Sequence, residues 1–249
     1  MRLPFRNRFR ETPRIRFSVH GDGDEDLLFV LGWGNEPDHE HVSWLLDRLG
    51  ETYRVHAVTI PTNGWDFEDQ YLAPVQSYYE DGDFDAVLSH STGGLVAAHL
   101  AERGDDPPRN VFLSPWWGTA PNEGFESVVL PYVLRLPTAR RLFTVDRDVS
   151  AIGDLKSEAE FEEGPRGVSP AFLRTVVDAQ ARLPAFREGD VVFCTLSDRV
   201  VGVRAIGDRT PAANLRAYDG GHEFFASSGR EAVLDDVLAT LDEGPAAVR

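Results

Sequence analysis

A serine between a strand-like apolar run and a helix is the strongest chemical signal in the sequence. Residues 86–94 read Ala-Val-Leu-Ser-His-Ser-Thr-Gly-Gly, which places Ser91 in a small-x-Ser-x-Gly pattern. A turn this tight accepts only small residues two places before and after the serine, here Ser89 and Gly93, and it exposes the hydroxyl at the start of a helix. The pattern predicts a nucleophile at Ser91, and the alternative is a surface serine in an ordinary strand–turn–helix.

A histidine late in the chain is the candidate base, because a serine hydroxyl needs a base to become a good nucleophile. His222 follows the strand-like run Leu215–Tyr218, and two glycines before it let its loop fold back toward Ser91. Of the seven histidines it best fits the chain order serine, acid, histidine. The alternative is a loop histidine that caps the last helix.

The acid that would orient this histidine is expected after the preceding strand. Asp198 ends the apolar run that begins at Val191, and it can accept the Nδ1–H of His222 and fix the tautomer. The alternative for Asp198 is a cap for the following helix. Asp208 and Asp219 are rivals, although Asp219 is more simply a turn residue.

Two backbone N–H groups are candidates for holding a negatively charged oxygen. One belongs to Thr92, directly after Ser91, and the other to Trp33, in the break after the apolar run that ends at Leu31. Gly32 and Gly34 flank Trp33 and would let this backbone approach a substrate closely. The alternative is a glycine turn with a buried tryptophan.

Strand-like and helix-like segments alternate along most of the chain. This alternation predicts an α/β protein with a doubly wound, mostly parallel sheet. The expected strands are Ile15–Val19, Leu27–Leu31, Tyr53–Ile60, Ala86–Ser89, Asn110–Ser114, Val191–Leu196 and Leu215–Tyr218, and the expected helices are His41–Leu49, Gln70–Tyr79 with an interruption near Pro74, Thr92–Arg103 and Arg230–Leu241.

The middle of the chain departs from this alternation. Residues 115–188 contain no convincing buried strand, and they have helix-like stretches at Tyr132–Leu136 and Pro170–Leu183. We therefore expect a helical insertion over one end of the sheet. The predicted organisation is a basic arm at 1–14, a core in two parts at 15–114 and 189–249, and the insertion at 115–188.

With these motifs, the chain resembles the α/β-hydrolase superfamily over residues 15–241. Residues 32–34, 197–201 and 221–225 most resemble the pimeloyl-carrier-protein methyl esterase group and related small carboxylesterases. The chain departs from that group in having Leu31 where the group usually has histidine before glycine, and Ser89 where it usually has glycine.

The resemblance implies an α/β-hydrolase fold in which residues 115–188 form a helical cap. It also implies that tryptophans after the fifth strand line an acyl pocket, whose alternative role is packing between cap and core. The implied site residues are Ser91, Asp198 and His222 as the catalytic triad, Trp33 and Thr92 as the oxyanion donors, and Trp33, Trp116 and Trp117 as substrate-binding residues.

These residues predict a serine hydrolase that cleaves a carboxylic ester or thioester through an acyl-enzyme. The expected substrate is a small molecule with an apolar acyl part, and no cofactor is expected. An acyltransferase or a C–C bond hydrolase would use the same residues. A non-catalytic pseudohydrolase that binds a ligand or partner is a further alternative, which the intact order of serine, aspartate and histidine disfavours.

The other histidines and the cysteine have simpler explanations. His39 and His41 stand among acidic residues, which resembles a metal site in composition, but chance explains this in so acidic a chain and no metal is expected. His90 and His99 are expected to be structural. Cys194, the single cysteine, excludes an intrachain disulfide framework.

Charge and composition bound the partners of the protein. The 249 residues include 25 basic and 41 acidic residues, a net charge of −16, which disfavours nucleic-acid binding by the body of the chain. The only lysine is Lys156, and this acidic, lysine-poor composition resembles halophilic proteins. No signal peptide or membrane span is predicted, so we expect a cytoplasmic protein. The basic arm is expected to be a solvated tail, with contact to an anionic surface as the alternative, and the oligomeric state is open.

Overall fold

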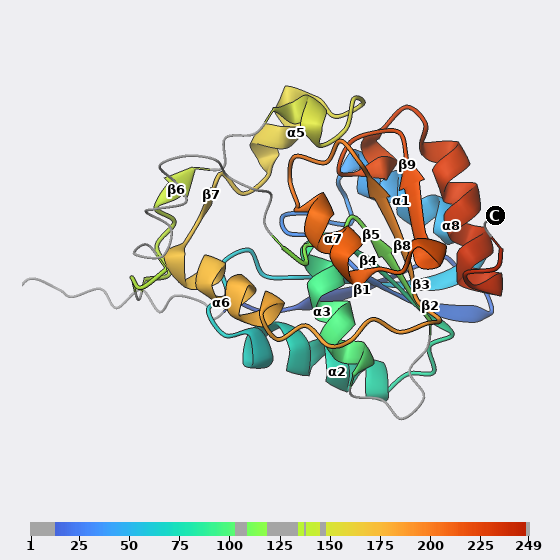
Figure 1. Cartoon of the computed structure of the whole chain (residues 1–249), viewed down its shortest axis with the longest axis horizontal. Helices are drawn as coiled ribbons and strands as arrows, with labels where there is room; N and C mark the ends of the chain where they lie inside the picture. The colour runs from blue at the N-terminus through green and yellow to red at the C-terminus, as the bar shows by residue number, and fades with distance from the viewer. Residues whose placement is uncertain (1–12, 103–108, 119–133, 137, 145–147, 248–249) are drawn as a thin grey trace, which may run out of the picture.

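The computed structural model of the protein describes residues 13–102, 109–118, 134–136, 138–144 and 148–247. A seven-stranded sheet in the order β1-β3-β2-β4-β5-β8-β9 forms its centre (Figure 1). Strand β1 pairs antiparallel with β3, and every other neighbouring pair of this sheet is parallel. The strands are β1 (Arg16–His20), β2 (Glu25–Val30), β3 (Tyr53–Thr59), β4 (Ala86–His90), β5 (Arg109–Leu113), β8 (Val191–Thr195) and β9 (Leu215–Tyr218).

Helices cover both faces of the sheet, so the predicted doubly wound α/β fold is confirmed. Successive side chains of a strand point to opposite faces, and in β2 Leu28 and Val30 join one apolar cluster whereas Leu27 and Phe29 join the other. The first cluster includes side chains of α2 (Ala73–Glu80) and α3 (Thr92–Ala101), and the second includes side chains of α1 (Glu40–Leu49) and α8 (Arg230–Glu243). Because both faces are covered, β4 and β8 are buried along their whole length.

The helix predicted around Pro74 shows how a proline is accommodated. A π-helical turn at Glu68–Leu72 continues into α2, and Pro74 lies in the first turn of α2. Proline has no N–H to donate to the preceding turn, and the wider π-helical turn lies directly before it. The predicted interruption is therefore a change of helix type.

The chain between β5 and β8 is an insertion between two neighbouring strands of the sheet. Its described part lies to one side of the sheet (Figure 1). A ribbon of β6 and β7 was not predicted, because two-residue strands leave no periodicity in a sequence. The elements in the described part of the insertion are β6 (Phe143–Thr144), a 3-10 turn (Val149–Ala151), α5 (Glu158–Glu163), β7 (Gly167–Val168) and α6 (Pro170–Gln180).

Two predicted features lie at the edge of what the structure describes. The predicted helix at 132–136 is described only from residue 134, and residues 134–135 form a turn. The basic arm lies outside the described residues except for Pro13 and Arg14.

Helix α7 (Val203–Arg209) follows Asp198 after a short loop.

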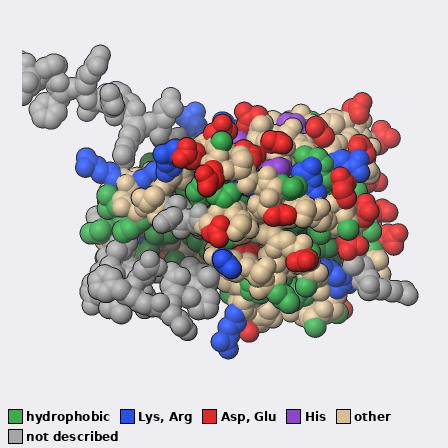
Figure 2. Space-filling model, turned by 90° about the horizontal axis from the view of Figure 1, so that it is seen from above, with side chains coloured by type: hydrophobic (Ala, Val, Ile, Leu, Met, Phe, Trp, Pro, Cys, Tyr) green, Lys and Arg blue, Asp and Glu red, His purple; other side chains and the backbone are tan. Residues whose placement is uncertain are grey.

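Acidic side chains are numerous on the face of the molecule drawn in Figure 2. Figure 2 shows Asp and Glu over much of the visible face, with arginines scattered among them. The single lysine is not part of this surface, because the side chain of Lys156 is only 12% exposed. Among the helices of the described residues, none is both long and apolar enough to cross a membrane.

Candidate active site

Ser91 stands in a strained turn between β4 and α3. Its backbone has φ 51° and ψ −115°, a conformation that residues other than glycine rarely adopt. Three backbone hydrogen bonds hold it there: the Ser91 N–H donates to Leu113 O at 3.0 Å, and Ser91 O accepts from the N–H of Gly94 at 3.0 Å and of Trp116 at 2.9 Å. Neighbouring strands and the following loop thus fix the position of the serine.

The small residues around Ser91 are required by close packing. A Cβ atom on Gly93 would lie 2.2 Å from the carbonyl oxygen of Val30, and one on Gly94 would lie 2.7 Å from Cβ of Pro115. Ser89, two places before the serine, is completely buried. The sequence pattern that predicted the turn therefore reflects the contact of α3 with β2 and with the loop after β5.

Asp198 is hydrogen-bonded to His222. Its Oδ2 atom lies 2.7 Å from His222 Nδ1, and its Oδ1 atom accepts from the N–H groups of Val200 at 2.7 Å and Val201 at 3.0 Å. Burial alone would raise the pKa of Asp198, but His222 and the two N–H groups outweigh it and hold that pKa below its ordinary value. The His222 and Asp198 side chains are 5% and 0% exposed.

The rival aspartates lie elsewhere. Asp208 is an exposed residue of α7 that faces Arg204, with 3.9 Å between the charged atoms. Asp219 is an exposed turn residue directly after β9. Of the three candidates, the structure brings only Asp198 to His222.

The loop that carries His222 is held from two sides. On the side of the sheet, the Tyr218 hydroxyl donates to the carbonyl oxygens of Gly221 at 2.9 Å and His222 at 3.2 Å. On the side of the insertion, the His222 N–H donates to Ala151 O at 3.1 Å, and the next N–H donates to Ile152 O at 2.7 Å. The imidazole is thus fixed by both the core and the insertion.

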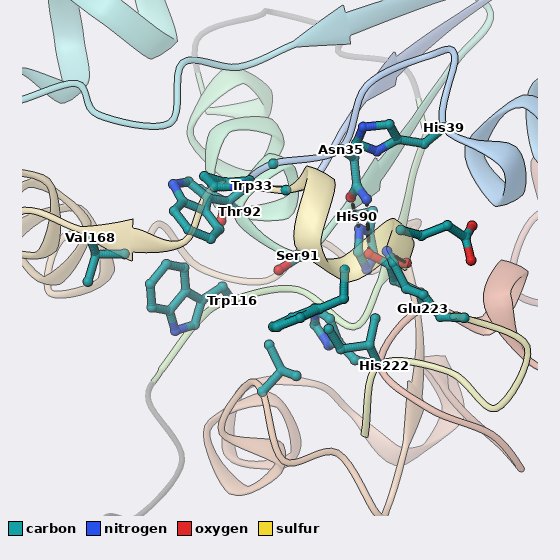
Figure 3. A pocket seen from close by; sticks show the side chains of 18 of the residues that line it. Trp33, Asn35, His39, His90, Ser91, Thr92, Trp116, Val168, His222 and Glu223 are labelled. Carbon is teal, nitrogen blue, oxygen red and sulfur yellow. Dashed lines mark hydrogen bonds and ion pairs between the residues drawn. The ribbon is translucent and has the colours of Figure 1, made fainter. Parts of the chain in front are cut away.

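One cavity brings together most of the predicted site residues. Ser91, His222, Trp33, Thr92 and Trp116 all line it (Figure 3). Asp198 lies behind His222. Trp117 is not at this cavity: it is buried in the core, where its indole N–H donates to Gly94 O at 3.2 Å and its ring packs against Phe112.

The cavity has an apolar half and a polar half. On one side of Ser91, Trp33 and Trp116 face the ring of Phe172 from α6, with ring centroids 6.0 and 6.3 Å away. Figure 3 shows Val168 on this side as well, and Asn35, His39, His90 and Glu223 on the opposite side of Ser91. Lys156 and Glu160 also line the cavity.

The backbone N–H groups of Trp33 and Thr92 are available at the cavity. Within the part of the chain that the structure describes, neither donates to a protein acceptor. The chain before Trp33 can pass close to the His90 ring because residue 32 is glycine. A Cβ atom at this position would lie 2.5 Å from His90 Nδ1. The Trp33 indole is held by its own bond to Thr62 O at 2.9 Å.

A buried polar network lies next to His222. Glu223 accepts from Lys156 at 2.7 Å and from Asn35 at 2.9 Å, and Asn35 Oδ1 lies 3.2 Å from His90 Nδ1. Sequence reasoning assigned no role to Lys156, Glu223 or Asn35. A signal was present for Lys156, since a lone lysine in a chain with so many arginines marks an unusual environment.

His39, His41 and His99 each have hydrogen-bond partners within the fold. His39 Nδ1 accepts from the Glu36 N–H at 3.3 Å, and His41 lies within hydrogen-bond distance of Leu155 O and Arg230. His99 is buried in α3, with Nε2 3.0 Å from Ala179 O. Across the described ranges, no group of three or more His, Cys, Asp or Glu residues is arranged to hold a metal ion.

Comparison with known proteins places this arrangement in a family. Residues 19–236 match the family model described as the alpha/beta hydrolase family. The chain belongs to the alpha/beta hydrolase family. As a member it is a hydrolytic enzyme, and the narrower resemblance to methyl esterases stays a prediction.

Solved structures share the fold of this hydrolase at low sequence identity. The monoacylglycerol lipase of Paleococcus ferrophilus has a TM-score of 0.73 at 18% identity, over 92% of this chain and 98% of that one. A soluble variant of the monoglyceride lipase of Saccharomyces cerevisiae, in complex with a substrate analogue, has a TM-score of 0.75 at 11% identity, over 93% and 92% of the two chains.

A curated relative matches the hydrolase more locally. The dihydrolipoyllysine-residue acetyltransferase component of the acetoin cleaving system of Cupriavidus necator is 33% identical over 128 residues. The match covers 45% of this chain and 32% of that protein. The matched segment therefore spans only about a third of that relative's length.

Proposed function

We propose that this hydrolase cleaves a carboxylic ester or thioester through an acyl-enzyme, with Ser91 as nucleophile, His222 as base and Asp198 as the acid that orients the base. The observation that carries the proposal is the 2.7 Å bond between Asp198 and His222 at the cavity that Ser91 also lines. A serine in a strained turn, a histidine and a buried aspartate are the groups that acyl transfer needs.

The proposed reaction follows from the arrangement of these groups. Asp198 accepts the Nδ1–H of His222, which leaves Nε2 free to take the proton of Ser91 as its oxygen attacks the substrate carbonyl. The N–H groups of Trp33 and Thr92 donate to the oxygen that becomes negative, and one such donor contributes about 3–4 kcal/mol to barrier lowering. His222 then protonates the leaving group, and water releases the acyl group by the same steps.

The cavity supports an apolar acyl group. Trp33, Trp116 and Phe172 form an aromatic wall on one side of Ser91, which favours a hydrocarbon chain there. We propose that residues 115–188 act as a cap that supplies part of this wall, over a core of residues 15–114 and 189–249. The names of the two lipases of similar fold are in line with an acyl substrate.

Replacing the proposed nucleophile tests the function. Ser91→Ala is expected to abolish labelling by a fluorophosphonate and to remove nearly all hydrolysis of p-nitrophenyl esters, because no other activated hydroxyl lines the described part of the cavity. Esters of increasing acyl length, compared by kcat/KM, report the size of the apolar half.

The fold of the variant is the control. Circular dichroism and thermal melting of Ser91→Ala should match those of the parent protein, since the substitution removes one oxygen at a cavity. Undiminished turnover by a folded Ser91→Ala protein would exclude the proposed nucleophile.

A further inference from the structure

Lys156 is the only lysine of the chain, and it lies partly buried at the cavity of the candidate active site. Its ammonium donates to Oε2 of Glu223 at 2.7 Å, and the two side chains are only 12% and 8% exposed. Taking two charges out of water is costly, so such a pair contributes little to stability compared with apolar residues of the same size. Its position at the cavity points to a role in the chemistry.

The pair is connected to His222 through side chains. Glu223 Oε1 accepts from Asn35 at 2.9 Å, Asn35 Oδ1 lies 3.2 Å from His90 Nδ1, and the centroid of the His90 ring is 4.8 Å from that of His222. Figure 3 shows Asn35, His90, Glu223 and His222 gathered on one side of Ser91. The pair is therefore linked to the imidazole of the proposed base through Asn35 and His90.

The protonation states in this network are fixed by burial and by neighbouring charges. Burial, followed by repulsion from His222, lowers the pKa of His90 to about 3, so His90 is neutral at physiological pH. Burial opposes ionisation of Glu223, but Lys156, His90 and the hydrogen bonds from Lys156 and Asn35 outweigh it and lower the pKa of Glu223 to about 2. The lasting charges are thus one positive on Lys156 and one negative on Glu223.

We propose that Lys156 and Glu223 are positioning residues that set how readily His222 takes up a proton, with the lysine cancelling the field of the buried carboxylate. The inference rests on the proposed role of His222 as the base. A carboxylate next to the imidazole, if unpaired, would stabilise the imidazolium and leave less free base near neutral pH. The ammonium removes this effect while the carboxylate keeps its hydrogen bond from Asn35.

The same pair joins the insertion to the His222 loop. Around it, Glu223 N–H donates to Ile152 O at 2.7 Å and Leu155 N–H donates to Ala226 O at 2.9 Å.

The titratable groups that face or flank His222 come from several elements. They are Asp198 after β8, His90 on β4, Tyr218 on β9, Glu223 in the same loop, Lys156 and Glu160 in the insertion, and His39 before α1.

Removal of the Glu223 charge and removal of the Lys156 charge are expected to shift the acid limb of the kcat/KM profile in opposite directions. Glu223→Gln keeps the oxygen that accepts from Asn35 but leaves the Lys156 ammonium unpaired, so the acid limb of the kcat/KM profile should move to lower pH by about half a unit. Lys156→Met leaves the carboxylate unpaired, so the acid limb should move to higher pH by about the same amount. Lys156→Arg and the double variant should stay near the parent midpoint.

Two measurements report the shift. One is the pH dependence of kcat/KM with a p-nitrophenyl ester, and the other is an NMR titration of the His222 Cε1–H resonance in a Ser91→Ala background, which needs no turnover. Arg54→Met is the matched control, because Arg54 also pairs with a carboxylate, Asp26, but stands at the start of β3, at the opposite end of the sheet. Its midpoint should equal that of the parent.

The outcomes separate this inference from the proposed function. The inference is supported if the midpoint of the acid limb lies at lower pH in Glu223→Gln than in Lys156→Met. Midpoints that coincide, or that lie in the reverse order, overturn it. If Lys156→Met does not fold, the direction for Glu223→Gln against the parent decides alone. Loss of Ser91 dependence in the hydrolysis assay would instead overturn the proposed function, and the NMR titration would still give a result.

Discussion

Asp198 shows how a single side chain can be fixed for a task. The backbone N–H groups of Val200 and Val201 hold one carboxylate oxygen, which turns the other toward His222 Nδ1. Because His222 is itself held through its own backbone, the bond between the two side chains has little freedom. At the scale of residues, the candidate site is pre-organised by main-chain hydrogen bonds rather than by side-chain crowding.

Asp198→Asn is expected to lower kcat by about a thousandfold or more, since the amide has nearly the same shape but lacks the charge that stabilises the imidazolium and favours the wrong tautomer. Steady-state kinetics on an ester substrate measure the loss. Asp219→Asn is the matched control, because Asp219 is exposed and takes part in none of the described hydrogen bonds of His222. A larger loss in Asp219→Asn than in Asp198→Asn would reassign the acid.

At the scale of elements, the junction of β4 and α3 positions Ser91 by close packing. The start of α3 touches the backbone of β2, and the loop after β5 covers it from the other side. The insertion completes the site differently, by hydrogen bonds along the His222 loop and by the Phe172 ring of α6. Core elements thus hold the nucleophile, and the insertion shapes the cavity around it.

Gly93→Ala is expected to destabilise the protein by about 2–3 kcal/mol, because the new methyl group would meet the carbonyl oxygen of Val30, which cannot move without shifting β2. Gly207→Ala is the control: nothing lies within 4 Å of a Cβ there, so alanine within α7 should stabilise by up to about 1 kcal/mol. Urea unfolding midpoints measure both changes. Equal stability of the two variants would contradict the described contact between α3 and β2.

At the scale of the whole molecule, net charge is the dominant feature. The net charge is −16, and acidic side chains are numerous on the face drawn in Figure 2, whereas the side chains of His222 and Asp198 are shielded from solvent. Repulsion among surface charges reaches about 10 Å at 0.1 M salt and about 3 Å at 1 M salt. Salt should therefore act on the folded state as a whole more than on the site.

The melting temperature is expected to rise steeply from about 0.1 to about 2 M KCl, because screening removes repulsion that favours expansion. The value of kcat per folded molecule should change little, which activity assays normalised to the folded fraction can check. Sucrose at matched osmolality separates screening from the exclusion of solutes. A melting temperature that is flat or falls with KCl would contradict a salt adaptation and reopen a role for the acidic surface in binding a basic partner.

The sequence by itself determined the elements of the core and the setting of Ser91. Continuous apolar runs between helix-like segments predicted the parallel strands, because strands covered on both faces need apolar residues in succession. The small residues around Ser91 predicted the turn, because its sterics act within a few residues along the chain. Both signals are local, which is why they can be read without the fold.

The tertiary structure decided what depends on distant parts of the chain. Lys156 meets Glu223 across 67 positions and Asn35 meets Glu223 across 188 positions, and no local pattern encodes either contact. The same holds for Trp116 and Trp117, which are adjacent in sequence but face the cavity and the core respectively. Side-chain direction in a loop is set by the surfaces that the loop passes between, so the charged half of the cavity could be found only once the insertion was in place beside the sheet.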